Sequence, residues 1–213
     1  MGKKEIKLLL EAGIEMQKRN LTVETWGNLS LRDEHDHVYI TPSGMPYDRL
    51  KEEDVVILNM DGTVYQGERK PSVEAMMHIL IYQNRKDVSA IMHTHPVASA
   101  VFAVLHQPIP VITDEMAQAI GGAVQVTEYA LPGSMELAEN TVKALGERQA
   151  CLLANHGAVC VGKDFRECFK VAEVLESSSE IYQKALAVGT PHEIAEDKVK
   201  WMRDFALYHY GQK

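Results

Sequence analysis

The stretch "IMHTHP", residues 91 to 96, places two histidines one residue apart at the end of an apolar run. The run from 87 to 94, "DVSAIMHT", predicts a buried β-strand, and Pro96 predicts that a helix starts directly after it. Side chains two positions apart on a strand point to the same face of a sheet. We therefore expect His93 and His95 to present two imidazoles on one side of a buried strand.

Two imidazoles at this spacing can chelate one metal ion, and neutral imidazole suits Zn²⁺. The best candidate for a third ligand is His156, because "LLANHG", residues 152 to 157, ends a second apolar run at a glycine turn. Three histidines leave one coordination position open, which is typical of a catalytic zinc site rather than a structural one. The alternative is that these histidines are ordinary buried residues with hydrogen-bond partners.

The other histidines provide a comparison within the same chain. His35 and His37 have the same spacing, but acidic residues surround them in "RDEHDH", which predicts a solvated hairpin turn. The remaining histidines have no histidine close to them in sequence: His78, His106, His192 and His209.

Hairpins and helices alternate along the chain. The predicted elements besides the strand at 87–94 are a helix over 4–19, hairpins over 22–44 and 54–67, helices over 71–83, 96–105 and 134–145, two strands around a turn at 155–157, and helices over 164–188 and 192–208. A proline-rich link and "IGGAVQV" precede the helix at 134. The frequent hairpins favour a mixed sheet with helices on its faces over a doubly wound parallel sheet. No repeat or low-complexity linker divides the chain, so we expect one domain over 1–213.

Composition and charge limit the classes of partner. The chain of 213 residues carries a net charge of −8 and no block of Lys and Arg, so we expect no binding to nucleic acid or to an anionic membrane. Its three cysteines form no CxxC pair, which indicates a reducing compartment. Glu11 and Glu15 interrupt the apolar residues near the start, and no apolar run approaches the ~20 residues of a membrane helix. We expect a cytoplasmic protein.

Glu74 is a candidate general acid/base. It is expected in the first turn of a helix whose N-cap is Ser72, but a capping box would place the glutamate at position 75, where Ala75 stands. Its carboxylate is therefore free for proton transfer. The alternative is that it only interacts favourably with the helix dipole.

Three short segments are suited to binding an anion. Gly27-Asn28, Ser43-Gly44 and Pro71-Ser72 offer backbone N–H groups, small hydroxyls and a helix N-terminus, which together suit a phosphate. Each segment taken alone is also typical of an ordinary turn.

Five motifs in this chain resemble those of the class II aldolase/adducin family, in particular its L-fuculose-phosphate aldolase branch. They are "TWGNLSLR", "ITPSGMPYDRL", "KPSVEAMMHILIYQ", "IMHTHP" and "LLANHGAV", and they occur in the family's order and spacing. The resemblance runs from about residue 4 to residue 188. It implies a three-layer α/β/α fold around a mixed, mostly antiparallel sheet. It also implies a homotetramer with active sites between neighbouring subunits.

The resemblance carries roles onto matching positions. It implies one Zn²⁺ per subunit on His93, His95 and His156, with Glu74 as the acid/base that also touches the metal in the resting enzyme. The implied phosphate cradle is Gly27, Asn28, Ser43, Gly44, Ser72 and Val73. Val73 stands where the fuculose branch has a second serine, and only its backbone N–H can donate.

The implied reaction is zinc-dependent cleavage of a ketose 1-phosphate, such as L-fuculose 1-phosphate, to dihydroxyacetone phosphate and a small aldehyde such as lactaldehyde. The alternatives within the family are a 4-epimerase, a sugar-acid phosphate decarboxylase or dehydratase, and an adducin-like interaction domain. The proton donor on the aldehyde side stays open. A family tyrosine matches Tyr208, with Tyr210 as the competing choice, and the segment where another tyrosine is expected offers Asp114 and Glu115.

Overall fold

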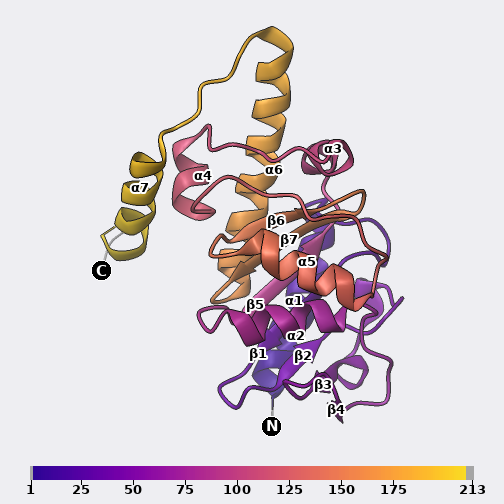
Figure 1. The fold of residues 1–213 in the computed structure, drawn as a ribbon. Coiled ribbons are helices and arrows are strands. Elements are labelled where there is room, and N and C mark those ends of the chain that lie inside the picture. Colours follow the sequence, from indigo (N-terminus) through magenta and orange to yellow (C-terminus); the bar gives the residue numbers. More distant parts are fainter. Residues whose placement is uncertain (1, 210–213) are drawn as a thin grey trace.

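The central sheet has seven strands in the order β4-β3-β2-β1-β5-β7-β6 (Figure 1). The computed structural model describes residues 2–209. The strands are β1 (Asn28–Arg32), β2 (Val38–Ile40), β3 (Val56–Leu58), β4 (Val64–Gln66), β5 (Ala90–Thr94), β6 (Ala150–Leu153) and β7 (Gly157–Gly162). All pairings between these strands are antiparallel, and an isolated parallel bridge joins Val126 to Leu152 at one edge.

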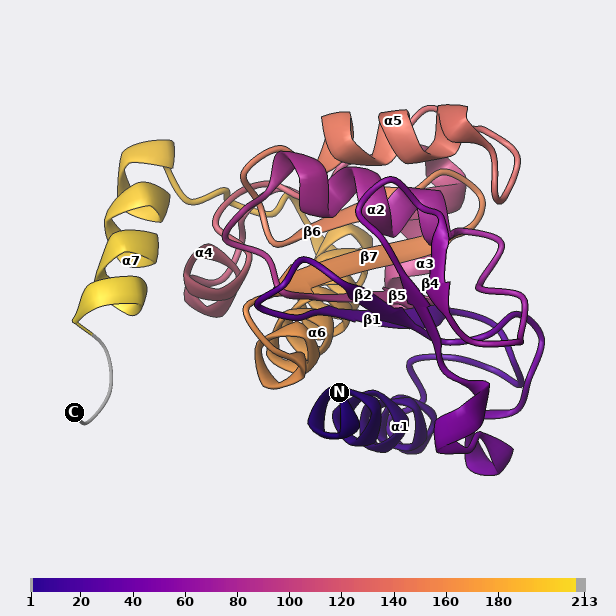
Figure 2. The same cartoon turned by 90° about the horizontal axis from the view of Figure 1, so that it is seen from below.

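Seven α-helices and two short 3₁₀ turns are described around this sheet. The helices are α1 (Lys3–Lys18), α2 (Ala75–Asn84), α3 (Val97–Leu105), α4 (Asp114–Ala119), α5 (Met135–Leu145), α6 (Phe165–Val188) and α7 (Glu196–Tyr208), and the 3₁₀ turns are Tyr47–Arg49 and Glu52–Asp54. Figure 2 shows α2 and α5 on one face of the sheet and α1 and α6 on the other. The three-layer α/β/α fold is therefore confirmed.

Strand periodicity divides the core between the two faces. On β5, Ala90 and Met92 belong to the apolar cluster shared with α1, α3, α4 and α6. Ile91 belongs to the second cluster, shared with α2 and α5. Because successive strand residues point to opposite faces, His93 lies on the same side as Ile91, under α2.

The hairpin tip that carries the second histidine pair is confirmed as a turn. Asp33 Oδ1 accepts hydrogen bonds from the backbone N–H groups of His35 and His37, both at 2.9 Å. His35 is exposed, and the His37 ring stacks on Tyr65 with 4.3 Å between ring centroids. The tip follows Arg32 at one end of β1, whereas His93 pairs with Asn28 at the other end, so the same spacing did not bring this pair to the site.

Two helices away from Glu74 differ from the sequence prediction. The short helix α4 was not predicted; the Thr113 hydroxyl caps it by accepting the N–H of Met116 at 3.2 Å. The last helix begins at Glu196 rather than at 192, because 190–195 form a connection after α6 whose Ile194 N–H donates to Val111 O at 2.8 Å.

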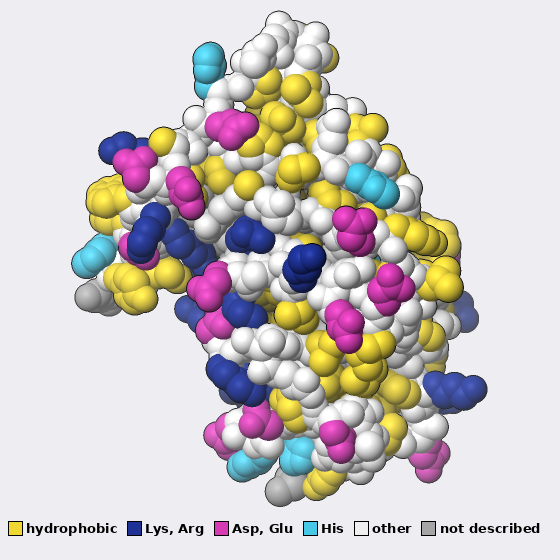
Figure 3. Space-filling model, viewed as in Figure 1, with side chains coloured by type: hydrophobic (Ala, Val, Ile, Leu, Met, Phe, Trp, Pro, Cys, Tyr) yellow, Lys and Arg dark blue, Asp and Glu magenta, His cyan; other side chains and the backbone are white. Residues whose placement is uncertain are grey.

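The surface carries both signs of charge. On the face shown in Figure 3, acidic and basic side chains are interspersed with hydrophobic ones. No helix within residues 2–209 has the length and apolar character needed to span a bilayer. The three cysteines, Cys151, Cys160 and Cys168, are buried and carry free thiols.

Candidate active site

His93 and His95 come together at the carboxyl end of β5. His93 is fully buried, and its Nδ1–H donates to the carbonyl oxygen of Ala158 on β7 at 2.9 Å, which leaves Nε2 unprotonated in the neutral ring. His95 follows the strand, and its backbone N–H donates to Leu21 O at 2.8 Å. The two Nε2 atoms are 3.0 Å apart. The predicted juxtaposition of the two imidazoles is confirmed.

His156 joins them from the turn between β6 and β7. Asn155 adopts a left-handed φ of 54°, and its Oδ1 accepts a hydrogen bond from His106 Nε2 at 2.6 Å, which fixes the turn. The His156 ring centroid lies 4.8 Å from that of His93 and 5.1 Å from that of His95. One ligand atom from each of the three histidines lies within 4.8 Å of the others. Residues far apart in sequence thus form a single cluster.

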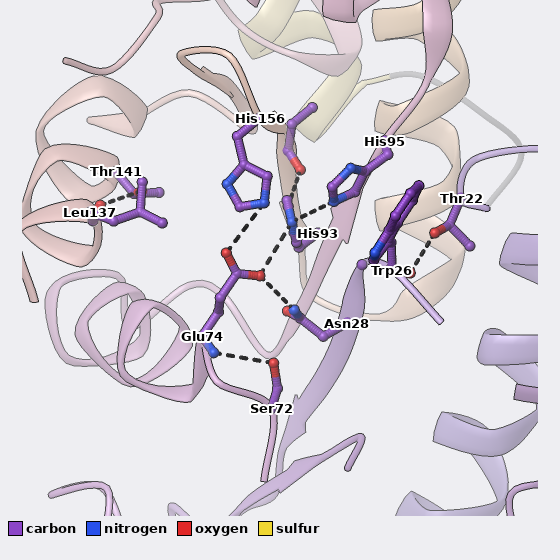
Figure 4. A network of polar contacts seen from close by, with 12 residues as sticks. Thr22, Trp26, Asn28, Ser72, Glu74, His93, His95, Leu137, Thr141 and His156 are labelled. Atoms are coloured by element: carbon purple, nitrogen blue, oxygen red, sulfur yellow. Dashed lines mark hydrogen bonds and ion pairs between the residues drawn. The ribbon is translucent and has the colours of Figure 1, made fainter. Parts of the chain in front are cut away.

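Glu74 faces this cluster from the start of α2 (Figure 4). Its side chain is only 5 % exposed, with Oε2 at 3.3 Å from His93 Nε2 and Oε1 at 3.5 Å from His156 Nε2. Oε2 also accepts a hydrogen bond from Asn28 Nδ2 at 2.8 Å. Oε1 is buried and has no hydrogen-bond partner among the described residues.

The start of α2 corrects the expected position of Glu74. The helix begins at Ala75, so Glu74 is the N-cap residue and does not lie in the first turn. Ser72 precedes the helix, and its hydroxyl accepts the Glu74 N–H at 3.2 Å. The Glu74 carboxylate makes no capping hydrogen bond to its own helix. Its orientation is therefore set by the histidines and Asn28.

Burial and neighbouring charges determine the protonation of the site. Burial raises the pKa of Glu74, but His93, His156 and the Asn28 hydrogen bond lower it by more, which keeps the carboxylate ionised. Burial, together with repulsion from His93, lowers the pKa of His95 to about 3 and that of His156 to about 4. The site thus combines a carboxylate with the neutral imidazoles of His95 and His156, the forms that bind a metal cation.

The residues present fit a divalent metal ion. Three imidazole nitrogens converge, and the His93 Nδ1–H bond to a backbone carbonyl is the outer contact that usually orients a metal-binding histidine. The buried Oε1 of Glu74 has no hydrogen-bond partner among the described residues, and a nearby cation would satisfy it. Three protein nitrogens leave room for a further ligand.

The three candidate anion-binding segments lie beside this cluster. An isolated bridge pairs Pro42 with Pro71, which brings Ser43-Gly44 next to the segment before α2. Gly27-Asn28 begins β1, where Asn28 pairs with His93. Val73 is 65 % exposed, whereas Ser72 is buried. The Asn28 side chain is engaged by Glu74, so its amide is committed to the carboxylate.

The candidates for the aldehyde-side donor occupy exposed positions. Tyr208 lies on α7 and is 69 % exposed, and α7 packs against α4. Asp114 and Glu115 lie exposed in the first turn of α4. Tyr210 lies outside the described residues.

Several residues near the site were not predicted from the sequence. Trp26 stacks on His95 with 6.2 Å between ring centroids. Ser30, His78 and Tyr82 form a buried polar group behind Glu74. A sequence signal existed for one of them, because His78 follows Glu74 by four residues and so shares its side of the helix start.

The α/β/α fold and the three-histidine cluster define the class of this protein: it can hold a divalent metal ion beside a buried carboxylate. Comparison with known proteins supports the same class. The sequence profile of the family described as Class II Aldolase and Adducin N-terminal domain matches residues 7–183. The chain belongs to this family, and it is a lyase of the class II aldolase type.

Individual relatives cover nearly the whole chain. It is 37 % identical over 198 residues to a 5-deoxy-D-ribulose 1-phosphate aldolase from Bacillus thuringiensis serovar kurstaki, covering 92 % of each chain. It is 32 % identical over 190 residues to an L-fuculose phosphate aldolase from Escherichia coli O6:H1, covering 89 % of this chain and 87 % of the relative. A solved L-fuculose 1-phosphate aldolase superimposes with a TM-score of 0.94 at 35 % identity, covering 98 % of both chains.

Two glycines allow a matched test of how tightly the site is built. Gly27 has a φ of 74°, and a Cβ there would lie 2.6 Å from the His93 carbonyl oxygen; Gly44 has a φ of 68° and nothing within 4 Å. Gly44→Ala should lower the free energy of unfolding by roughly 1–2 kcal/mol through left-handed strain alone. Gly27→Ala should lose about 2–5 kcal/mol, because strain is added to a clash with the backbone of β5. Urea titration measures both, and equal losses would contradict the close approach.

Proposed function

We propose that this chain is a zinc-dependent aldolase that cleaves a ketose 1-phosphate to dihydroxyacetone phosphate and a small aldehyde. The observation that carries the proposal is the buried Glu74 carboxylate, 3.3 and 3.5 Å from two imidazoles of the three-histidine cluster. The names of two similar proteins, one of them a solved structure, contain L-fuculose 1-phosphate and 5-deoxy-D-ribulose 1-phosphate. Both compounds are ketose 1-phosphates, which supports this substrate class.

The proposed metal ligands are His93, His95 and His156, with Glu74 as an additional contact in the resting enzyme. Zn²⁺ is the proposed ion because three imidazoles and an open position are typical of catalytic zinc. When bound, the ion acts as a Lewis acid that stabilises negative charge developing on the substrate oxygens.

Glu74 is the proposed acid/base at C3 of the ketose phosphate. Cleavage of the C3–C4 bond turns the C4 hydroxyl into the aldehyde carbonyl, so that hydroxyl loses its proton while the electron pair of the bond stays on C3. The ionised Glu74 carboxylate takes up this proton, directly or through the aldehyde-side group, and delivers it to C3. In the condensation direction the carboxylate removes the same proton. The Asn28 amide holds one carboxylate oxygen at 2.8 Å, so the other oxygen is oriented toward the cluster.

Gly27, Asn28, Ser43, Gly44, Ser72 and Val73 are the proposed phosphate cradle, to which Asn28 contributes through its backbone because Glu74 and His78 hold its side-chain amide. The bridge between Pro42 and Pro71 supports this, because it places two of the three segments side by side next to Glu74. The exposed Val73 contributes only its backbone N–H to such a cradle. A phosphate held there is remote from the bond broken and fixes the orientation of the sugar.

We also propose one catalytic domain over 1–213 and a cytoplasmic homotetramer with active sites at the subunit interfaces. The exposure of Tyr208 supports its proposed role as a proton donor to a neighbouring subunit's aldehyde site.

A panel of substrates tests the reaction. We expect the purified protein to release dihydroxyacetone phosphate from L-fuculose 1-phosphate or 5-deoxyribulose 1-phosphate, detected by a coupled glycerol-phosphate dehydrogenase assay. The same preparation is offered a pentulose 5-phosphate and a sugar-acid phosphate, which the family's epimerases and decarboxylases use. Rapid turnover of either, without cleavage of any ketose 1-phosphate, would transfer the assignment to that activity.

The metal ligands are tested with a control that has the same spacing. His93→Ala should abolish most zinc binding and most cleavage, because a single site implies about one zinc per chain. His35→Ala, at the exposed histidine of the hairpin tip, should keep both. Elemental analysis and turnover are measured on the same preparations. Full zinc content in His93→Ala would refute the ligand assignment.

Glu74→Gln separates proton transfer from helix stabilisation. If Glu74 transfers the proton, turnover should fall on the order of 10²–10⁴-fold while the zinc content is retained. Glu136→Gln is the control, since Glu136 is an exposed carboxylate in the first turn of α5. It should lose roughly 0.3–1 kcal/mol of stability and no rate. Near-normal turnover of Glu74→Gln would leave Glu74 without a catalytic role.

A further inference from the structure

A chain of buried polar groups runs from the interior of the protein to Glu74. Tyr82 Oη is 2.8 Å from Ser30 Oγ, and Ser30 Oγ is 2.6 Å from His78 Nδ1. His78 Nε2 is 2.6 Å from Asn28 Oδ1, and Asn28 Nδ2 is 2.8 Å from Glu74 Oε2. Tyr82, Ser30 and His78 are 0 % exposed, and Asn28 and Glu74 are 5 % exposed.

The donor and acceptor atoms of these groups allow the hydrogen bonds to run in one direction, with donation from Tyr82 toward Glu74. An ionised carboxylate only accepts, so Asn28 Nδ2 donates to Glu74, and Asn28 Oδ1 must accept from the other side. His78 is therefore protonated on Nε2, and its Nδ1 accepts the Ser30 hydroxyl proton. Burial, aided by His93, lowers the pKa of His78 to about 3, which keeps the ring neutral with a single N–H. Ser30 Oγ in turn accepts from the Tyr82 hydroxyl.

The orientation of the Asn28 amide depends on this direction. If the amide turned over, its Oδ1 would face the Glu74 carboxylate and its Nδ2 would face the His78 N–H, so two buried contacts would become repulsive. His78 prevents this as long as Ser30 holds its Nε2–H tautomer. Buried polar networks of this kind are stable only when each group has its partner.

We propose that His78 is a positioning residue: its Nε2–H locks the Asn28 amide so that Nδ2 holds the Glu74 carboxylate in its reactive orientation. This inference rests on the proposed catalytic role of Glu74. Within residues 2–209 no hydrogen bond joins His78 to Glu74 or to the three histidines of the cluster, so its hydrogen-bonded connection to the carboxylate runs through Asn28.

The first test compares two substitutions of the metal-loaded enzyme. His78→Leu removes the donor that orients the Asn28 amide. It should lower kcat about 10–100-fold, the usual effect of losing a hydrogen bond to a charged group, here that of Asn28 to Glu74, with KM for the ketose 1-phosphate and zinc content nearly unchanged. His78→Gln places an amide N–H near the former Nε2 and should restore most of kcat. A purely structural role would instead lower the melting temperature and the zinc content while leaving kcat per zinc unchanged, which would overturn the proposal.

The second test covers the case in which His78→Leu does not fold. NMR of the zinc-loaded wild-type protein with ¹⁵N-labelled histidine should show His78 as the neutral Nε2–H tautomer. Ser30→Ala, a small change on β1, should lower kcat and mix the two His78 tautomers. A wild-type His78 protonated on Nδ1 would overturn the inference. Absence of cleavage by the wild-type enzyme with the Nε2–H tautomer intact would instead count against the proposed function alone.

Discussion

The structure of the site depends on keeping one carboxylate ionised inside the protein. Removing a carboxylate from water costs several kcal/mol unless partners compensate. Glu74 accepts the Asn28 amide N–H and lies 3.3 and 3.5 Å from the imidazoles of His93 and His156, where a cation held by the cluster would compensate the rest of its charge. This requirement explains why β1 and α2 face each other with Ser30 and His78 where apolar side chains would otherwise pack. Ser30 and His78 are polar because they support the charge of the Glu74 carboxylate.

Strand register brings these groups together. Asn28 on β1 pairs with His93 on β5, and His93 pairs with Val159 on β7, close to the turn that carries His156. A slip by one residue would move every side chain of a strand to the opposite face. The apolar residues of β5 prevent such a slip, because its two faces belong to separate cores. The packing of Ile91 and Met92 therefore also fixes the position of the His93 imidazole relative to the turn that carries His156.

Much of this arrangement could be predicted from local pattern. The paired histidines, the helix after Pro96 and the turn before Gly157 follow from spacing and turn chemistry, and the predicted strands lie where the structure has them. The partnership of His78 could not be predicted, since its contacts with Ser30 and Asn28 span 48 and 50 residues. The helix α4 has only six residues, too few for a clear periodicity. The N-cap position of Glu74 depends on how Ser72 bonds locally, which composition does not reveal.

The one-way hydrogen-bond chain behind Glu74 has a consequence for how this sequence can change over evolution. Ser30, His78 and Asn28 each donate one hydrogen bond along this chain and accept another, so a substitution that suits one neighbour leaves the other without a partner. Effects of substitutions within such a network are non-additive. Tyr82, Ser30, His78 and Asn28 are therefore expected to vary together among relatives, as one inherited unit. Exposed residues around the site, such as Trp26 and Val73, are free of that coupling and offer the routes by which substrate preference can diverge.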